Sequence, residues 1–477
     1  MLPRRVSAIL PAAMKIQRLA TIGIAVLTLL CTIGAARAAT EIQFWHAMTG
    51  ERGKEIDSLV QRFNASQKDI AVVATYKGGY DEVLAAALAA HKAGQPPHLV
   101  QVYELGTATI MAAKGVTRPV SQVLEEGGVR LDAKAFVPPV ASYFSDASGR
   151  LLAMPFNIST PVMYVNRDAF RKAKLDPDKP PKTWYEMVAT LGALKDAEQA
   201  CAFTTTYPSW VLIENMSAWH DQEFATHGNG IGGLEAKLIF NTRLMVRWIS
   251  VLTSWHKAEY FTYSGRGTEA EDRFAKGECA ILTASSSRQG DLRRGAKFDW
   301  GVAQLPHYDD FAGAPHHTLI GGAGLWAMAG KKPDEYRAVA KFLGYVAQPD
   351  VQAEWHQTTG YVPVTMAAYE STRKSGFYGK HPGEEVAVKQ LLLHGPSKDS
   401  RGIRIGHFPE IRAIIEEELE QAWAGKKTPK DSLDRAVERG NELLRKFELA
   451  HRGGQPAAKP AAKPAPARKP AAKADKK

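Results

Sequence analysis

Apolar residues follow two different spacings along this chain, and the alternation of these spacings predicts the fold class. Short apolar or β-branched runs predict strands at 41–45, 70–76 and 98–102. Apolar residues at 56, 59, 60 and 63 keep the spacing of one helix face, and a second helix, rich in Ala and Leu, is predicted over 81–93. Strands that alternate with helices predict an α/β domain with a largely parallel sheet.

The alternation continues along the chain and predicts more than one domain. We expect further strands at 151–157, 162–166, 278–284 and 319–327, and further helices at 184–194, 334–346 and 431–449. A body of about 410 residues exceeds what a single core usually supports, so two domains are predicted. Ligands of such sheets bind beyond the carboxyl ends of the strands, which is where Tyr80, Glu104 and the loop after His46 lie.

The two ends of the chain differ from the body in composition. In residues 1–38, basic residues precede an uncharged apolar stretch and a small-residue site, which predicts an exported protein whose signal peptide is cleaved near Ala38. A membrane anchor is the alternative, because the apolar stretch is close to the lower limit for a span. Residues 452–477 are mostly Ala, Pro and Lys, and this tail is predicted to be disordered.

Most of the positive charge lies at these ends. Of the net charge of +11, residues 1–38 carry +5 and residues 452–477 carry +7, which leaves −1 on the body. A nearly neutral body argues against a nucleic-acid partner. Cys201 and Cys279 are the cysteines of the body, and they fit either one disulfide or two buried thiols.

Motifs for catalysis are absent from the body. It has no Gly-rich phosphate loop, no Gly-x-Ser-x-Gly turn, no His-Glu-x-x-His helix and no paired metal-ligand spacing. The pair His316 and His317 comes closest to a metal motif, and in its Gly- and Pro-flanked loop it is expected to be solvated. We therefore expect no metal, no cofactor and no enzymatic activity.

Two polar clusters are candidates for binding an anion. Ser285, Ser286 and Ser287 follow a predicted strand and precede a helix, where hydroxyls and backbone N–H groups can hold an anion or a polyol or can simply cap the helix. Arg404 and Arg412 belong to the second cluster, which begins at Arg401. The planar fork of arginine matches a phosphate or a carboxylate.

Several sequence blocks carry a resemblance to a known family. They are Phe-Trp-His-Ala-Met at 44–48, Tyr-Lys-Gly-Gly-Tyr at 76–80, Gln-Val-Tyr-Glu at 101–104, Phe-Asn-Ile-Ser-Thr-Pro at 156–161, Thr-Gly-Tyr at 359–361 and Pro-Glu-Ile-Arg at 409–412. Over residues 40–450 the chain resembles the periplasmic sn-glycerol-3-phosphate-binding proteins of ABC importers, which are extracellular solute-binding proteins. The tail lies outside the resemblance.

The resemblance implies a two-lobed Venus-flytrap fold of the type II periplasmic-binding proteins, hinged around a cleft. It predicts one lobe from residues 39–156 plus 319–355 and another from 157–318 plus 356–451. A monomer that delivers sn-glycerol-3-phosphate to the transmembrane permease subunits of an importer is expected.

Ligand contacts are also implied by the resemblance. The family positions fall on Tyr80, Glu104, Ser159, Ser285, Gly322, Tyr361 and Arg412. Arg412 is expected to hold the phosphate in its fork and Glu104 to accept the glycerol hydroxyls. Replacing Arg412 by Ala is then expected to abolish binding with little change in melting temperature.

One departure from the family concerns a segment that commonly has tryptophan at both ends. The chain keeps Trp210, an expected ligand contact, but has Tyr207 at the other end. Aromatic faces there would attract the choline of a glycerophosphodiester, so Tyr207 leaves that second ligand open.

Two alternatives remain at this point. An oligosaccharide-binding protein of the same fold would use stacked aromatics rather than an arginine. A glycosidase or phosphodiesterase would need two carboxylates or a metal pair in the cleft, where only Glu104 is expected.

Overall fold

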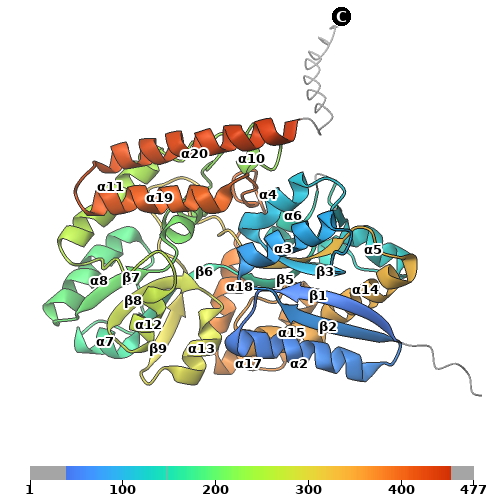
Figure 1. The fold of residues 1–477 in the computed structure, drawn as a ribbon. Helices are drawn as coiled ribbons and strands as arrows, with labels where there is room; N and C mark the ends of the chain where they lie inside the picture. The colour runs from blue at the N-terminus through green and yellow to red at the C-terminus, as the bar shows by residue number, and fades with distance from the viewer. Residues whose placement is uncertain (1–38, 147, 453–477) are drawn as a thin grey trace, which may run out of the picture.

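The computed structural model describes residues 39–146 and 148–452 (Figure 1). The predicted signal peptide and the predicted tail from residue 453 onward lie outside the described residues.

Two sheets form the centre of the molecule. The six-stranded sheet contains β1 Thr40–His46, β2 Ile70–Tyr76, β3 Leu99–Tyr103, β4 Thr117–Arg118, β5 Met154–Ser159 and β10 Gly321–Met328. The four-stranded sheet contains β6 Pro161–Asn166, β7 Cys201–Thr205, β8 Cys279–Ser285 and β9 Trp300–Ala303. The strand order is β2-β1-β3-β10-β4 in the first sheet, where β5 also pairs with β10, and β7-β8-β6-β9 in the second.

The prediction of a largely parallel sheet is wrong. Only β1 with β2, β1 with β3, and β7 with β8 pair in parallel, while the other five pairings are antiparallel. Strand β10 returns to the first sheet after the chain has passed through the second, and it runs against β3, β4 and β5. A helical crossover between neighbouring strands of one sheet makes them parallel. β10 instead enters from the other lobe, so it can run antiparallel to its neighbours.

The chain passes from one sheet to the other at a single residue. Thr160 separates β5, in the six-stranded sheet, from β6, in the four-stranded sheet. The return lies between β9 and β10. The fold is therefore the two-lobed α/β arrangement that was predicted, and the exact lobe boundaries stay a prediction.

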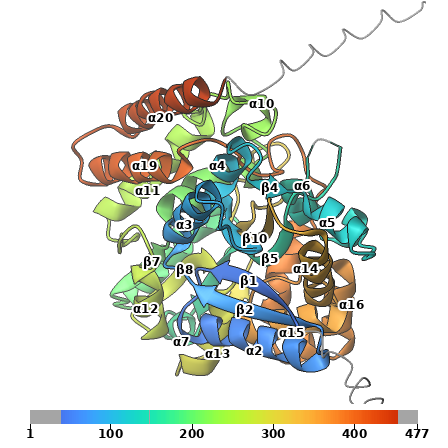
Figure 2. The ribbon, with the colours of Figure 1, turned by 45° about the vertical axis from the view of Figure 1, so that its right-hand side comes forward.

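Helices cover the faces of both sheets (Figures 1 and 2). Those that precede β5 are α2 Gly50–Ser66, α3 Tyr80–Lys92, α4 Thr107–Ala112, α5 Val120–Glu126 and α6 Pro138–Phe144, with the short turns η1 Glu104–Gly106 and η2 Ala133–Ala135. Between β6 and β10 lie α7 Arg167–Lys172, α8 Trp184–Asp196, η3 Ser209–Glu214, α9 Asn215–Trp219, α10 Thr226–Asn229, α11 Arg243–Lys257, α12 Glu269–Ala275 and α13 Arg288–Gly295. The C-terminal part adds α14 Pro333–Val346, α15 Pro349–Thr359, α16 Met366–Lys374, α17 Phe377–Lys380, η4 Pro382–Glu385, α18 Val386–Leu391, α19 Phe408–Trp423 and α20 Pro429–His451.

Local sequence explains where several helices begin. Thr183 caps α8, and Glu186 completes a capping box, while Thr242 and Thr428 cap α11 and α20 through their side chains. The apolar face of α11 is buried and brings Trp248 within 4.1 Å of the Trp184 ring. An aromatic core thereby fixes the outer helices of the second lobe.

A disulfide joins Cys201 to Cys279. The two residues are directly paired on the parallel strands β7 and β8. The structure thus decides between the two alternatives that the sequence left open.

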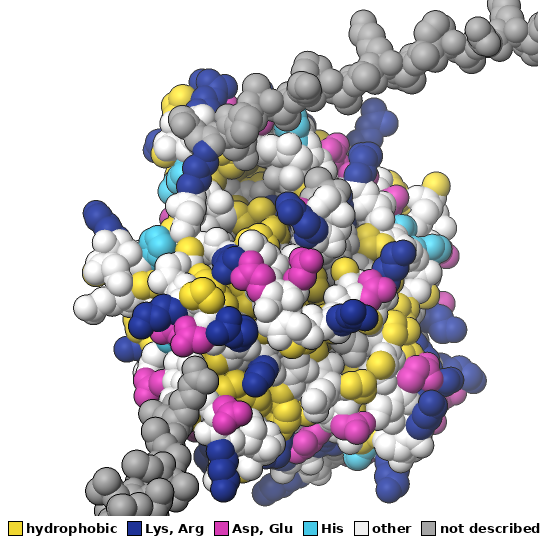
Figure 3. Space-filling view, turned by 90° about the vertical axis from the view of Figure 1, so that its right-hand side faces the viewer, with side chains coloured by type: hydrophobic (Ala, Val, Ile, Leu, Met, Phe, Trp, Pro, Cys, Tyr) yellow, Lys and Arg dark blue, Asp and Glu magenta, His cyan; other side chains and the backbone are white. Residues whose placement is uncertain are grey.

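The surface of the described residues is mixed in charge. Figure 3 shows Lys and Arg interspersed with Asp and Glu over one face, in keeping with a nearly neutral body. Within residues 39–146 and 148–452, no helix has both the length and the apolar character that crossing a membrane requires.

Candidate functional site

One cavity of about 490 Å³ is lined by residues of both lobes. It lies beyond the carboxyl ends of several strands, since Ala47 follows β1, Glu104 follows β3, and Ser159 and Ser285 end β5 and β8. All eight residues expected to contact a ligand line this cavity: Tyr80, Glu104, Ser159, Trp210, Ser285, Gly322, Tyr361 and Arg412. Segments separated by hundreds of positions thus meet at one place.

Arg412, the fifth residue of α19, is held by two carboxylates. Its Nε and Nη2 each donate to Glu214 at 2.7 Å, and its Nη1 donates to Glu104 Oε1 at 3.3 Å. The Glu214 side chain is 2% exposed and that of Arg412 is 14% exposed. The fork expected to hold a phosphate is therefore occupied by Glu214, and only Nη1 and its surroundings face a ligand.

Burial and the ion pairs around Arg412 shift the pKa of three side chains, those of Arg412, Glu104 and Glu416. Burial alone would lower the pKa of Arg412, but Glu214 and Glu104 outweigh it and raise that pKa. Burial raises the pKa of Glu104, against the opposing effect of Arg412. Glu416, which also lines the cavity, has its pKa raised to about 7 by burial, again against Arg412. Carboxylates outnumber the guanidinium at this end of the cavity.

Gly322 allows the backbone of β10 to come close to β5. Its φ is +98°, and a Cβ at this position would lie 2.0 Å from the Asn157 carbonyl oxygen. Its N–H donates to Glu104 Oε2 at 3.1 Å, so Glu104 is held from both sides by Gly322 and Arg412. Only glycine fits here without displacing a strand.

The tyrosines of the site are fixed by packing and by hydrogen bonds. The Tyr80 ring stacks on Tyr103 at 4.9 Å between centroids, and Asn157 Nδ2 donates to the Tyr80 hydroxyl at 3.0 Å. Burial raises the pKa of Tyr80 well above its ordinary value, so its hydroxyl stays a donor. Tyr361 stacks on Trp355, with ring centroids 6.1 Å apart.

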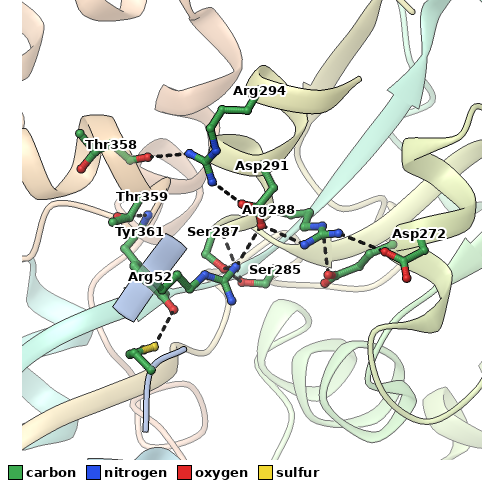
Figure 4. Close-up of polar contacts among 12 residues, drawn as sticks. Arg52, Asp272, Ser285, Ser287, Arg288, Asp291, Arg294, Thr358, Thr359 and Tyr361 are labelled. Atoms are coloured by element: carbon green, nitrogen blue, oxygen red, sulfur yellow. Dashed lines mark hydrogen bonds and ion pairs between the residues drawn. The ribbon is translucent and has the colours of Figure 1, made fainter. Parts of the chain in front are cut away.

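The serines sit where β8 runs into α13 (Figure 4). The hydroxyls of Ser285 and Ser287 lie 2.9 Å apart, and the Ser287 N–H donates to Ser285 Oγ at 3.3 Å. Both line the cavity, whereas Ser286 is buried and bonds to the backbone of Thr160. Two of the three serines can therefore reach a ligand.

An aromatic wall closes another side of the cavity. Trp210 lies in the π-helical turn η3, and its ring meets Tyr207 edge to face at 6.4 Å. Tyr207 has a φ of +43° and is 37% exposed. A left-handed backbone is costly for an aromatic residue, and such strain collects at functional sites.

Sequence reasoning missed several charged residues of the cavity. Arg52, Arg266, Glu271 and Glu416 line it, and so does Asp81. The expectation that Glu104 would be the one carboxylate there is therefore wrong. Glu214 directly follows the apolar run 210–213, and this position is a signal in the sequence, since a buried charge requires a partner.

Other predicted candidates lie elsewhere. Arg404 is buried and donates to the Ser145 carbonyl at 2.8 Å, outside the cavity. His317, expected to be solvated, is buried and bonds to Thr318 and Ser400, because the loop that carries it packs into the interior. Across the described ranges, no group of three or more His, Cys, Asp and Glu side chains could hold a metal ion.

Comparison with known proteins gives consistent similarities. Residues 58–381 match the family described as bacterial extracellular solute-binding protein. The sn-glycerol-3-phosphate-binding periplasmic protein UgpB of Yersinia pseudotuberculosis is 48% identical over 418 residues, which are 87% of this chain and 95% of that protein. UgpB of Salmonella paratyphi A is 49% identical over 418 residues, again 87% of this chain and 95% of that protein.

Solved structures share the fold. UgpB from Mycobacterium tuberculosis in complex with glycerophosphocholine has a TM-score of 0.72 and 23% identity, covering 86% of this chain and 100% of that one. The cyclic alpha-maltosyl-1,6-maltose binding protein from Arthrobacter globiformis has a TM-score of 0.70 and 20% identity over the same shares.

Proposed function

We propose that this chain, which belongs to the bacterial extracellular solute-binding proteins, captures sn-glycerol-3-phosphate in its cleft and delivers it to an ABC importer. The observation that supports it most is the single cavity that gathers serine hydroxyls, guanidinium groups and Glu104. Relatives 48–49% identical over 418 residues carry the name of this ligand.

The cavity suits a phosphorylated polyol in its chemistry. Hydroxyl donors from Ser159, Ser285 and the tyrosines can hold phosphate oxygens. The Glu104 oxygens already accept from Gly322 and Arg412, and as acceptors they suit the glycerol hydroxyls. Arg412 holds Glu104 in place and offers Nη1 beside it. Hydrogen bonds to charged groups contribute roughly 1.5–3 kcal/mol each, so a few supply the ~8 kcal/mol of a micromolar complex.

The location and partners follow from the same proposal. The curated relatives of this chain are periplasmic proteins, and a periplasmic location fits an exported binding protein. We expect cleavage of residues 1–38 near Ala38, a monomeric mature protein and docking to the transmembrane permease subunits. Transport requires no catalysis, and we propose that the cleft carboxylates bind rather than react.

A glycerophosphodiester is a second candidate ligand, supported by the aromatic wall. Tyr207 and Trp210 line the cavity together, so a choline group could lie against their faces by cation–π attraction. Replacing Tyr207 by Ala should then weaken the binding of glycerophosphocholine more than the binding of sn-glycerol-3-phosphate.

Calorimetric titration of the purified protein tests the proposal. sn-Glycerol-3-phosphate should bind saturably, with one site per chain, whereas glycerol and maltose should not. Binding of maltose instead would favour the oligosaccharide alternative. Equal binding of glycerol and of its phosphate would refute a phosphate-selective site.

A further inference from the structure

A second guanidinium reaches the cavity from the opposite lobe. Arg52, in the first turn of α2, places Nη2 3.3 Å from Ser287 Oγ and 3.5 Å from Asp291 Oδ2 (Figure 4). Its guanidinium carbon lies 5.6 Å from the centre of the Tyr361 ring. The side chain is 35% exposed and lines the cavity beside Ser285 and Ser287.

Arg52 has more free donors than Arg412. Within residues 39–146 and 148–452, the bond to Ser287 is the one hydrogen bond that its side chain donates. Arg412, in contrast, uses Nε, Nη1 and Nη2 on carboxylates. Since arginine has five N–H donors, Arg52 retains Nε and Nη1 for an incoming anion.

The charge around Arg52 is balanced rather than acidic. Asp291 is shared by three guanidiniums, those of Arg52, Arg288 and Arg294. The other carboxylates nearby are Glu271, 3.0 Å from Arg288, and Asp272, 3.5 Å from it. Three cations thus face three carboxylates here, whereas at the other end two cations, Arg412 and Arg266, face four carboxylates, those of Glu104, Glu214, Glu416 and Glu420. A dianion is therefore repelled less at the Arg52 end.

The helices that carry these two ends approach the cavity from different directions. Figures 1 and 2 show α19, which carries Arg412, above the strands, and α2 and α13 below them. For a ligand with a phosphate at one end and hydroxyls at the other, the charge distribution favours the orientation that places the hydroxyls toward Glu104 and the phosphate toward Arg52.

We propose that Arg52, together with Ser285 and Ser287, binds the phosphate of the ligand and thereby sets its orientation in the cleft. This inference rests on the proposed function, since it concerns the anionic end of that same ligand. Because Arg52 comes from one lobe and the serines from the other, the phosphate also bridges the lobes.

Matched variants test this assignment by calorimetry. Arg52→Leu keeps the apolar stem and removes the guanidinium, and it should raise the Kd for sn-glycerol-3-phosphate about 10- to 100-fold. Arg294→Gln removes a cation that contacts the same Asp291 but does not line the cavity, and it should change the Kd less than about threefold. Arg52→Lys keeps the charge but not the planar fork, so its Kd should lie between those of Arg52→Leu and Arg294→Gln.

A second readout separates ligand contact from a structural role. Phosphorus NMR should show the bound phosphate titrating at lower pH than the free ligand in the wild type, because a guanidinium stabilises the dianion. In Arg52→Lys this shift should shrink, and in Arg52→Leu it should largely disappear.

The outcomes distinguish this inference from the proposed function. Wild-type protein that fails to bind sn-glycerol-3-phosphate would refute the proposed function, whatever the variants do. Wild-type binding with an unchanged Kd in Arg52→Leu would overturn only the role of Arg52. An equal loss of affinity in Arg294→Gln would likewise overturn it. The effect would then come from the long-range charge of any nearby cation and not from a direct contact of Arg52 with the phosphate.

Discussion

Replacing Arg412 by Ala should destabilise the protein as well as impair binding, contrary to the expectation from sequence. The change leaves the 2% exposed Glu214 and its neighbour Glu104 without their cation. Removing one partner of a buried ion pair lowers the free energy of unfolding by about 3–5 kcal/mol. With an unfolding entropy of ~0.85 kcal/mol/K for about 410 residues, the melting temperature should fall by about 4–6 °C.

The loss should depend on pH in a defined direction. Burial raises the folded-state pKa of Glu104 and brings that of Glu416 to about 7, above the ordinary value of 4.5. Such carboxyls favour the folded state most below pH 4.5, and this contribution is lost as the pH rises through the folded-state pKa. Removing Arg412 raises both pKa values further, so the deficit should grow from pH 5 to pH 8.

Thermal and denaturant unfolding of the unliganded proteins at pH 5 and pH 8 provide the assay. The control is Arg266→Gln, which also removes a cavity arginine but one whose partner, Glu420, is partly exposed; it should cost less than about 1 kcal/mol. An Arg412→Ala protein within about 1 kcal/mol of the wild type at pH 8 would contradict the counterion role. So would a loss that is equal at the two pH values.

Other variants probe the remaining parts of the site and fold. Gly322→Ala should lower the free energy of unfolding by about 2–5 kcal/mol and abolish ligand binding, because its Cβ meets the Asn157 carbonyl. The control Gly330→Ala has a φ of +85° and open space around it, so it should lower this free energy by only about 1–2 kcal/mol. Urea unfolding measures both. Equal losses would contradict the close approach. Replacing both Cys201 and Cys279 by Ala should lower stability by about 2–4 kcal/mol, since their disulfide closes a separation of 78 residues, and reduced wild type should match the variant in guanidinium unfolding. Trp210→Phe should diminish the fluorescence response to sn-glycerol-3-phosphate while calorimetry still detects binding; an unchanged response would assign the signal to another tryptophan.

Local patterns predicted the elements well. The strands expected at 41–45, 70–76, 162–166 and 278–284 are β1, β2, β6 and β8, and the final helix is α20. These elements follow from periodicity and capping, which nearby residues determine. The helix α19 and the π-helical turn η3 were not predicted, although they carry Arg412 and Trp210. A π-helical turn of six residues is too short for its period to be visible in the hydrophobic pattern.

The eight cavity-lining residues Tyr80, Glu104, Ser159, Trp210, Ser285, Gly322, Tyr361 and Arg412 were predicted through resemblance rather than spacing. Composition and local pattern were enough to predict an exported α/β binding protein with hydroxyl and arginine candidates. They could not predict that Glu214 fills the fork of Arg412, 198 residues away, or that Arg52 contacts Ser287, 235 residues away; these contacts appear only in the folded chain. Which charges neutralise one another depends on distances between lobes and on burial, and neither is encoded in the local pattern of the chain.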